Sequence, residues 1–67
     1  MAMTSIESYP PIRVEIRVKG DQAQWDQVRA KSRGRLRVLS SWKPLEFAQR
    51  EAEAFAQRHQ VPLLTVT

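Results

Sequence analysis

The clearest feature of the chain is a strict alternation of apolar and charged residues over positions 12–19. Isoleucine and valine occupy every second position of the run IRVEIRVK, and charged residues fill the positions between them. A period of two places successive side chains on opposite faces of a strand. The pattern therefore predicts a half-buried β-strand, which Gly20 ends.

Positions 44–59 carry a different pattern, that of an amphipathic helix. Pro44 suits the first position of a helix, and the residues after it are good helix formers without a glycine. At about 100° per residue, one stripe gathers most of the apolar side chains. The stripe consists of Leu45, Ala48, Ala52, Phe55, Ala56 and His59. We expect it to pack on a sheet, and we expect Pro62 to end the helix near His59 or Gln60.

Three shorter segments complete the expected fold. Residues 35–42 and 61–66 are predicted strands. The adjacent leucines of residues 61–66 indicate either burial on both faces or a protected position in the sheet. Residues 21–32 are predicted to form a short helix with Trp25 and Val28 on one apolar seam. The alternative for this segment is a long hairpin loop, because two large apolar residues make a thin amphipathic face.

These elements predict a small α/β domain of β-α-β-α-β order, a three-stranded sheet with both helices packed on one face. If residues 21–32 form a loop, the class becomes α+β, a β-hairpin followed by one helix and one strand. Residues 12–67 form the single domain, and residues 1–11, which end in two prolines, are expected to form a flexible tail. A chain of 67 residues without cysteine has a small core and no disulfide, so we expect a homodimer.

The positive charge of the chain is concentrated in one part of it. Of the 11 lysines and arginines, eight lie in residues 13–37 against three acids, whereas the remainder of the chain is slightly acidic. If the predicted strands 12–19 and 35–42 are neighbours and both bury their apolar side, their arginines emerge together on one uncovered face of the sheet. We expect an acidic protein or a larger complex to dock there. The docking residues are predicted to be Arg13, Arg17, Arg33, Arg35 and Arg37.

Two other functions fit the same residues. In an extended conformation the cations of residues 29–37 would form a row spaced about 6–7 Å apart, which is similar to the spacing of phosphates. Such a row suits an accessory protein that binds nucleic acid without sequence specificity. The predicted strands 12–19 and 35–42, however, do not carry the interleaved aromatic residues that base stacking requires. The remaining alternative is a structural subunit whose charged face is merely solvated.

The outer side of the predicted helix 44–59 suggests how two copies could meet. Phe47 and Ala54 lie opposite the apolar stripe, close to Glu51 and Arg58. In an isologous dimer Glu51 of one copy would face the partner's Arg58. We therefore expect a helix-to-helix interface through these four residues, and a singly exposed phenylalanine is the plain alternative.

The sequence offers little for catalysis, metal binding or membrane insertion. His59 is the only histidine, cysteine is absent, and no serine lies in a G-x-S-x-G motif. We therefore expect no enzyme activity, no metal and no cofactor. No apolar run approaches the roughly 18 residues of a membrane span, and the first residues lack the features of a signal peptide. We expect no membrane partner and a cytoplasmic location.

Overall fold

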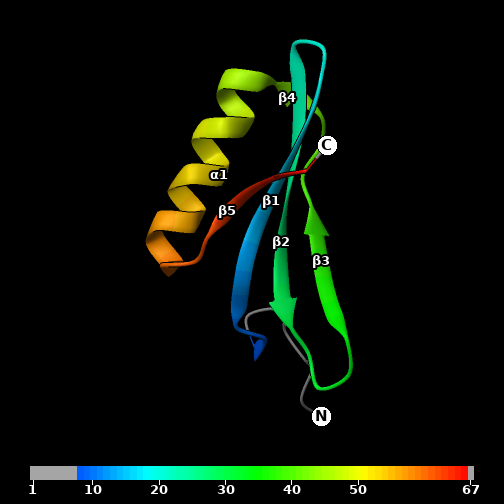
Figure 1. The fold of residues 1–67 in the computed structure, drawn as a ribbon, viewed down its shortest axis with the longest axis vertical. Helices are drawn as coiled ribbons and strands as arrows, with labels where there is room; N and C mark the ends of the chain where they lie inside the picture. The colour runs from blue at the N-terminus through cyan, green and yellow to red at the C-terminus, as the bar shows by residue number, and fades with distance from the viewer. Residues whose placement is uncertain (1–7, 67) are drawn as a thin grey trace.

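The chain forms one mixed sheet with a helix on one side, as shown by a computed structural model that describes residues 8–66 (Figure 1). The sheet has the strand order β3-β2-β1-β5, and β4 pairs with β2 next to the β1–β2 turn. β5 runs parallel to β1, and the other pairs are antiparallel. The elements are β1 (Pro11–Lys19), β2 (Gln22–Ala30), β3 (Arg35–Leu39), β4 (Lys43–Pro44), α1 (Leu45–His59) and β5 (Leu63–Val66).

The segment predicted to be the first helix is a central strand of the sheet. β2 forms a hairpin with β1 through a two-residue turn. The turn contains Gly20, whose φ of 63° is the left-handed conformation that such tight hairpin turns need. The spacing of Trp25 and Val28 is therefore no helical seam, because in a strand these two side chains lie on opposite faces.

The fold is thus a small α+β domain, and the three-stranded sheet with two helices is wrong. The sheet has five strands, and α1 is the only helix longer than a single turn among the described residues. The long hairpin loop considered for residues 21–32 is wrong too, because β2 is hydrogen-bonded on both sides, to β1 and to β3. Of that alternative, the α+β class and the order of the elements are correct: a hairpin comes first, then one helix and a last strand.

The other predicted elements are present with shifted ends. β1 and α1 match the two strongest patterns, although Pro44 precedes the helix instead of opening it. The strand predicted over 35–42 ends at Leu39, and β5 begins at Leu63, two residues later than predicted. β5 lies at the edge of the sheet, and its Leu64 is 47% exposed. We expected this strand to be buried on both faces or to lie in a protected position, and both expectations are wrong.

The end of α1 leads directly into the edge strand β5. Gln60 adopts a left-handed φ of 56°, and the N–H of Val61 donates to the carbonyl of Ala56 at 3.0 Å. These features close the last turn of the helix, which Pro62 could not continue. The carbonyl of Pro62 then accepts a hydrogen bond from the N–H of Val14 at 2.9 Å, which starts the pairing of β5 with β1.

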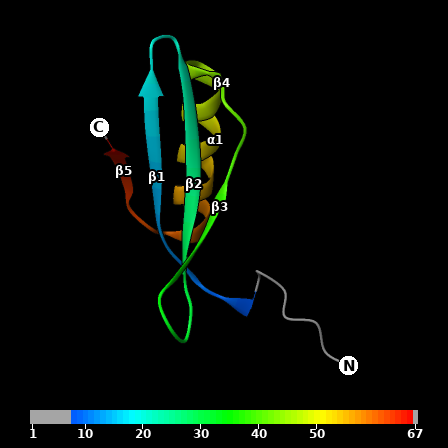
Figure 2. The same cartoon turned by 90° about the vertical axis from the view of Figure 1, so that its right-hand side faces the viewer.

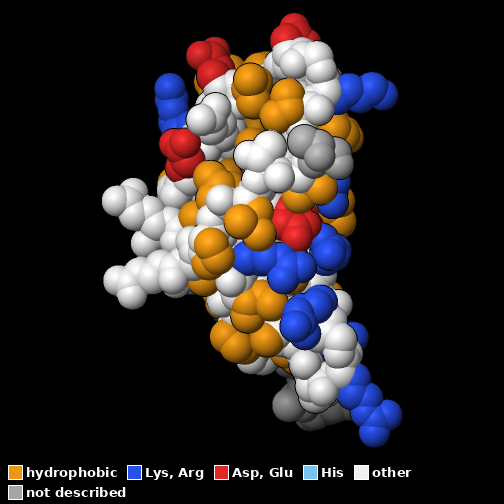
Figure 3. Space-filling view, viewed as in Figure 1, with side chains coloured by type: hydrophobic (Ala, Val, Ile, Leu, Met, Phe, Trp, Pro, Cys, Tyr) orange, Lys and Arg blue, Asp and Glu red, His pale blue; other side chains and the backbone are white. Residues whose placement is uncertain are grey.

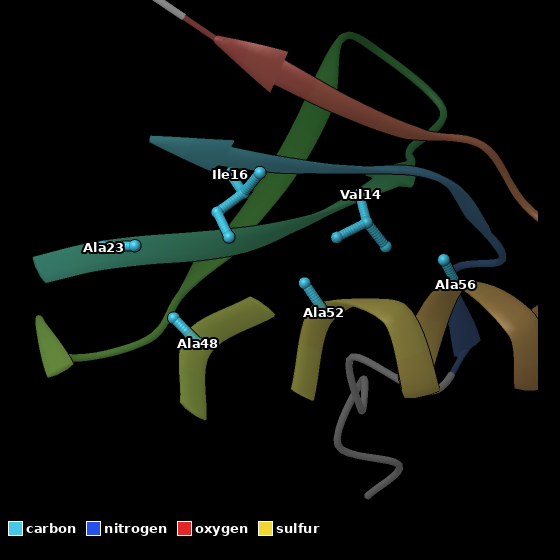
Figure 4. Close-up of a cluster of buried hydrophobic side chains, with 6 residues drawn as sticks. All are labelled: Val14, Ile16, Ala23, Ala48, Ala52 and Ala56. Atoms are coloured by element: carbon cyan, nitrogen blue, oxygen red, sulfur yellow. The ribbon is translucent and has the colours of Figure 1, made fainter. Parts of the chain in front are cut away.

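A stripe of alanines holds α1 on the sheet (Figure 4). Ala48, Ala52 and Ala56 are buried against Val14 and Ile16 of β1. Because the alanine side chains are short, the helix lies close to the sheet and any added volume has little space. Larger, partly buried side chains surround this contact: Trp25, Leu45, Phe55, Val61 and Leu63. The opposite face of the sheet has no covering helix within the described residues (Figure 2).

The last residues of the predicted flexible tail are tied to β2. Pro11 belongs to β1, and the carbonyl of Pro10 accepts a hydrogen bond from the N–H of Ala30 at 2.9 Å. The carbonyl of Tyr9 accepts another from Arg29 at 2.9 Å. Residues 1–7 of the predicted tail lie outside the described residues.

Candidate functional site

We call the sheet face turned away from α1 the open face. Val14 and Ile16 of β1 pack under the helix, so Arg13, Glu15 and Arg17, which alternate with them, lie on the open face. The sheet register places side chains of three further strands on the same face. They are Gln24, Asp26, Val28, Arg35, Arg37, Leu39 and Leu64.

Two buried carboxylates and three guanidinium groups form the centre of the open face. Glu15 and Asp26 are paired on β1 and β2 and are only 7% and 0% exposed. Arg13 donates from Nε to Glu15 at 2.8 Å. Arg37 donates from Nη1 to Glu15 at 2.6 Å and to Asp26 at 3.2 Å, and Arg17 Nη1 lies 3.6 Å from an oxygen of Asp26. We call these five residues the charge cluster.

The charge cluster is arranged so that Glu15 remains ionised. The hydrogen bond from Arg13 lowers the pKa of Glu15, and Arg37 lowers it further, whereas burial of the carboxylate acts in the opposite direction. The carboxylate of Glu15, with a smaller contribution from Asp26, raises the pKa of Arg37. With three cations and two anions, the cluster keeps an excess of positive charge at neutral pH.

Three of the five predicted docking arginines come together, and two do not. Arg13, Arg17 and Arg37 meet in the charge cluster. Arg35 lies farther along β3 and donates to the carbonyl of its neighbour Gly34 at 3.2 Å, and Arg33 is exposed in the β2–β3 turn. The two arginine-bearing strands are not neighbours as expected, because β2 lies between them. Arg37 of β3 is aligned with Val28 of β2, and its side chain extends over β2 to reach Asp26 and Glu15.

The continuous row of cations predicted over residues 29–37 does not form. Arg29 turns toward the α1 side of the sheet and is buried. Its Nε donates to the side chain of Gln27 at 2.9 Å, and its guanidinium group lies 5.7 Å from the ring centroid of Phe55. The row also breaks because the chain reverses direction between β2 and β3, at the turn that contains Gly34.

Asp26 is the functional candidate that the sequence prediction missed. It is fully buried, yet it lies in the segment that we expected to be helical. The signal that could have found it is the period of two in β2. Ala23 and Trp25 face the helix, whereas Asp26 and Val28 face the other way. Val28 hides this signal, because it is an apolar residue on the open face.

Exposed leucines flank the charge cluster on both edge strands. The register aligns Leu39, Asp26, Glu15 and Leu64 in one row across β3, β2, β1 and β5. Leu39 is 55% exposed and Leu64 is 47% exposed. No part of the described chain buries the side chain of Leu39. Along this row, the open face is therefore charged in its middle and apolar at its two ends.

The four residues of the predicted helix-to-helix interface lie exposed along α1. They are Phe47, Glu51, Ala54 and Arg58. Three of them, without Phe47, line a shallow hollow together with Trp25 and Phe55. Glu51 is already engaged within the chain: Lys43 approaches it at 2.7 Å and the indole N–H of Trp25 donates to it at 3.0 Å. These contacts, Lys43 above all, lower its pKa. A helix-to-helix dimer through these four exposed residues stays a prediction.

The part of the chain that the structure describes contains no cluster of side chains able to hold a metal ion. His59 is exposed and lies against Phe55, with 4.2 Å between the ring centroids and the two rings tilted by 37°. Over residues 8–66, no helix has both the length and the apolar character needed to cross a membrane. Comparisons with protein-family models, with curated proteins and with solved structures give no match to this chain. Its function therefore has to be inferred from the open face itself.

Proposed function

We propose that this protein is a small non-catalytic interaction module whose open face docks on an acidic protein surface. The observation that carries the proposal is the composition of this face. Its carboxylates are buried beneath arginines, and exposed leucines flank the arginines on both edge strands. Arginine and apolar side chains together are typical of the centre of protein interfaces.

The charge of the open face and of the adjoining β2–β3 turn favours an acidic partner. Glu15 and Asp26 are buried, so the charges presented to solvent are positive. The cations are Arg13, Arg17, Lys19, Lys31, Arg33, Arg35 and Arg37. Figure 3 shows lysine and arginine side chains gathered in the lower right of the molecule, whereas most acidic side chains lie in its upper part. Such an asymmetric field speeds the encounter with an acidic surface and disfavours a basic one.

The buried carboxylates also prepare the arginines for binding. Glu15 holds Arg13 by its Nε and Arg37 by one Nη. A guanidinium group has five N–H donors, and within the described residues these contacts leave most of them available to carboxylates of a partner. Because the side chains are already held in place, docking loses less conformational entropy than it would with free arginines.

A protein partner fits the open face better than a nucleic acid does. Nucleic-acid affinity comes mainly from contacts to phosphates, and exposed leucines such as Leu39 and Leu64 contribute nothing to such contacts. The only aromatic residue of β1, β2 and β3 is Trp25, which faces α1 and is not available for base stacking. The row of cations that would follow a phosphate backbone is interrupted, since Arg29 is buried.

The experiment measures binding to an acidic peptide and to nucleic acids. A fluorescent peptide of glutamates with interspersed leucines is titrated with the protein at about 50 and 200 mM salt, and labelled DNA and RNA are titrated in parallel. Arg35→Glu is the test variant, because Arg35 is exposed on the open face and lies outside the charge cluster. Arg50→Glu is the matched control, since Arg50 is exposed on α1.

We expect the peptide to bind, Arg35→Glu to weaken its binding severalfold, and Arg50→Glu to leave it nearly unchanged. Equal weakening by both variants would mean that only net charge matters, which contradicts docking on the open face. Tighter binding of DNA or RNA, with a steep loss between the two salt concentrations, would instead assign the same face to nucleic acid.

A further inference from the structure

One edge of the sheet lacks the charged side chains that often keep strand edges from pairing. β5 is the outermost strand, and no strand of the described chain pairs with its outer edge. Residues 61–66 contain no charged residue. Leu64 and Thr65 in the middle of β5 are exposed. Natural proteins usually protect such an edge with charges, a bulge or a covering segment.

The opposite edge of the sheet is protected in this way. β3 carries Arg35 and Arg37 at alternate positions. Two β3 edges would bring like charges together, which is unfavourable. Pairing of a β3 edge with a β5 edge would leave a free edge of each kind and would build an open filament. Only pairing of β5 with a second β5 uses the unprotected edge and closes after two copies.

The hydrogen-bonding pattern of β5 shows which backbone groups are available for such pairing. The N–H of Val14 donates to the carbonyl of Pro62, and Val14 is aligned with Leu63. In a parallel pair, the N–H and C=O groups of every second residue point toward the neighbouring strand. In β5, the groups of Leu64 and Val66 therefore point toward β1. The N–H and C=O groups of Leu63 and Thr65 therefore point outward, away from the sheet.

We propose that β5 is a self-association edge, on which a second copy of this chain adds its own β5 in antiparallel orientation. A two-fold axis perpendicular to the sheet would place Leu64 opposite the partner's Leu64, the close pairing of an antiparallel ladder. The outward groups of Leu63 would then exchange hydrogen bonds with those of the partner's Thr65. In Figure 3, hydrophobic side chains gather in the middle of the surface along which β5 runs in Figure 1.

The α1 helices of the two copies would leave room for this arrangement. α1 packs mainly over β1 and β2, so it is set back from the outer edge of β5 (Figure 2). Adjacent strands are about 4.8 Å apart and a helix is about 10 Å wide, so two helices fit on the same side of the joined sheet. The two open faces lie together on the other side. Association through β5 does not rest on the docking function, because it is measured without any other partner.

The first test measures the mass of the isolated 67-residue chain by sedimentation over roughly 1 μM to 1 mM. We expect the mass to approach twice the 7.8 kDa of one chain as the concentration rises. Thr65→Pro removes an outward N–H but no hydrogen bond to β1, and it should weaken association about tenfold or more. Thr65→Ala keeps the N–H and should associate like the unmodified chain. Circular dichroism verifies that both variants are folded.

The second test does not depend on the proline variant being folded. The chain contains no cysteine, so Leu64→Cys introduces a single thiol. Directly opposed residues of an antiparallel pair are close enough for a disulfide, and we expect rapid cross-linking of this variant under mild oxidation. Leu39→Cys is the matched control, because Leu39 is similarly exposed on the β3 edge. It should cross-link much more slowly.

Three results would overturn the proposal. One is a monomeric mass over the whole concentration range. Another is equal cross-linking of the Leu64→Cys and Leu39→Cys variants. The third is a dimer that survives Thr65→Pro but is lost in Ala54→Glu, which would assign association to the outer side of α1. Loss of peptide binding in the previous experiment with an unchanged dimer would overturn only the docking function.

Discussion

Neutralising Glu15 tests whether the charge cluster stabilises the fold as well as presenting arginines. The substitution Glu15→Gln keeps the shape of the side chain and removes its negative charge. Arg13, Arg17 and Arg37 then share only the carboxylate of Asp26, and an amide group replaces the strong acceptor between them. We expect the variant to fold but to be less stable than the unmodified chain at neutral pH.

The magnitude follows from the contacts of Glu15. A hydrogen bond to a charged group contributes about 1.5–3 kcal/mol, and Glu15 accepts one from Arg13 and one from Arg37. The Arg13 side chain is 30% exposed and that of Arg37 is 43% exposed, so water screens both contacts. We therefore expect Glu15→Gln to lower the free energy of unfolding by about 1–2 kcal/mol, or the melting temperature by roughly 5–15 °C.

The effect should depend on pH in a defined direction. The folded state lowers the pKa of Glu15, so its carboxylate contributes stability above the ordinary glutamate pKa of about 4.3. This contribution is lost as the pH falls through the lowered pKa of the folded state. Glutamine does not titrate. The two free energies of unfolding should thus differ at pH 7 and converge in acid, where Glu15 is protonated.

The assay is urea unfolding followed by tryptophan fluorescence at pH 7 and in acid. Glu53→Gln is the matched control, because Glu53 is exposed on α1 and Gln49 is its only hydrogen-bond partner among the described residues. We expect this control to change stability by less than about 0.5 kcal/mol. A pH-independent loss in Glu15→Gln, or no loss at pH 7, would refute the stabilising role of the charge cluster.

Three further substitutions test the packing and the turns. Ala52→Leu overfills the contact between α1 and the sheet and should cost about 1–3 kcal/mol in thermal unfolding, whereas Ala54→Leu on the exposed side of the same helix should be nearly neutral. Val14→Ala removes volume from a fully buried site and should cost about 2 kcal/mol in urea unfolding; an effect below 0.5 kcal/mol would contradict its place in the core. Gly34→Ala forces a side chain into a φ of 86° and should cost about 1 kcal/mol, all of it from backbone strain, because nothing lies within 4 Å of the added carbon.

The sequence alone determined the elements whose side chains have one environment on each face. β1 was predicted because its apolar and charged residues alternate without a fault, and α1 because its alanines recur with the period of a helix. β2 was missed because both of its faces are partly buried: Trp25 packs toward the helix, whereas Val28 and Asp26 are buried on the open face. A strand that is buried on both faces has lost the alternation by which strands are detected.

Only the tertiary structure decided what the arginines contact. The sequence placed Arg13, Arg17 and Arg37 on strands with the correct phase, but phase does not give strand order. The insertion of β2 between β1 and β3 brings Asp26 beside Glu15 and turns a row of repelling cations into a paired cluster. Ion pairs between distant segments depend on register, and register is fixed by the packing of all strands together rather than by any one of them.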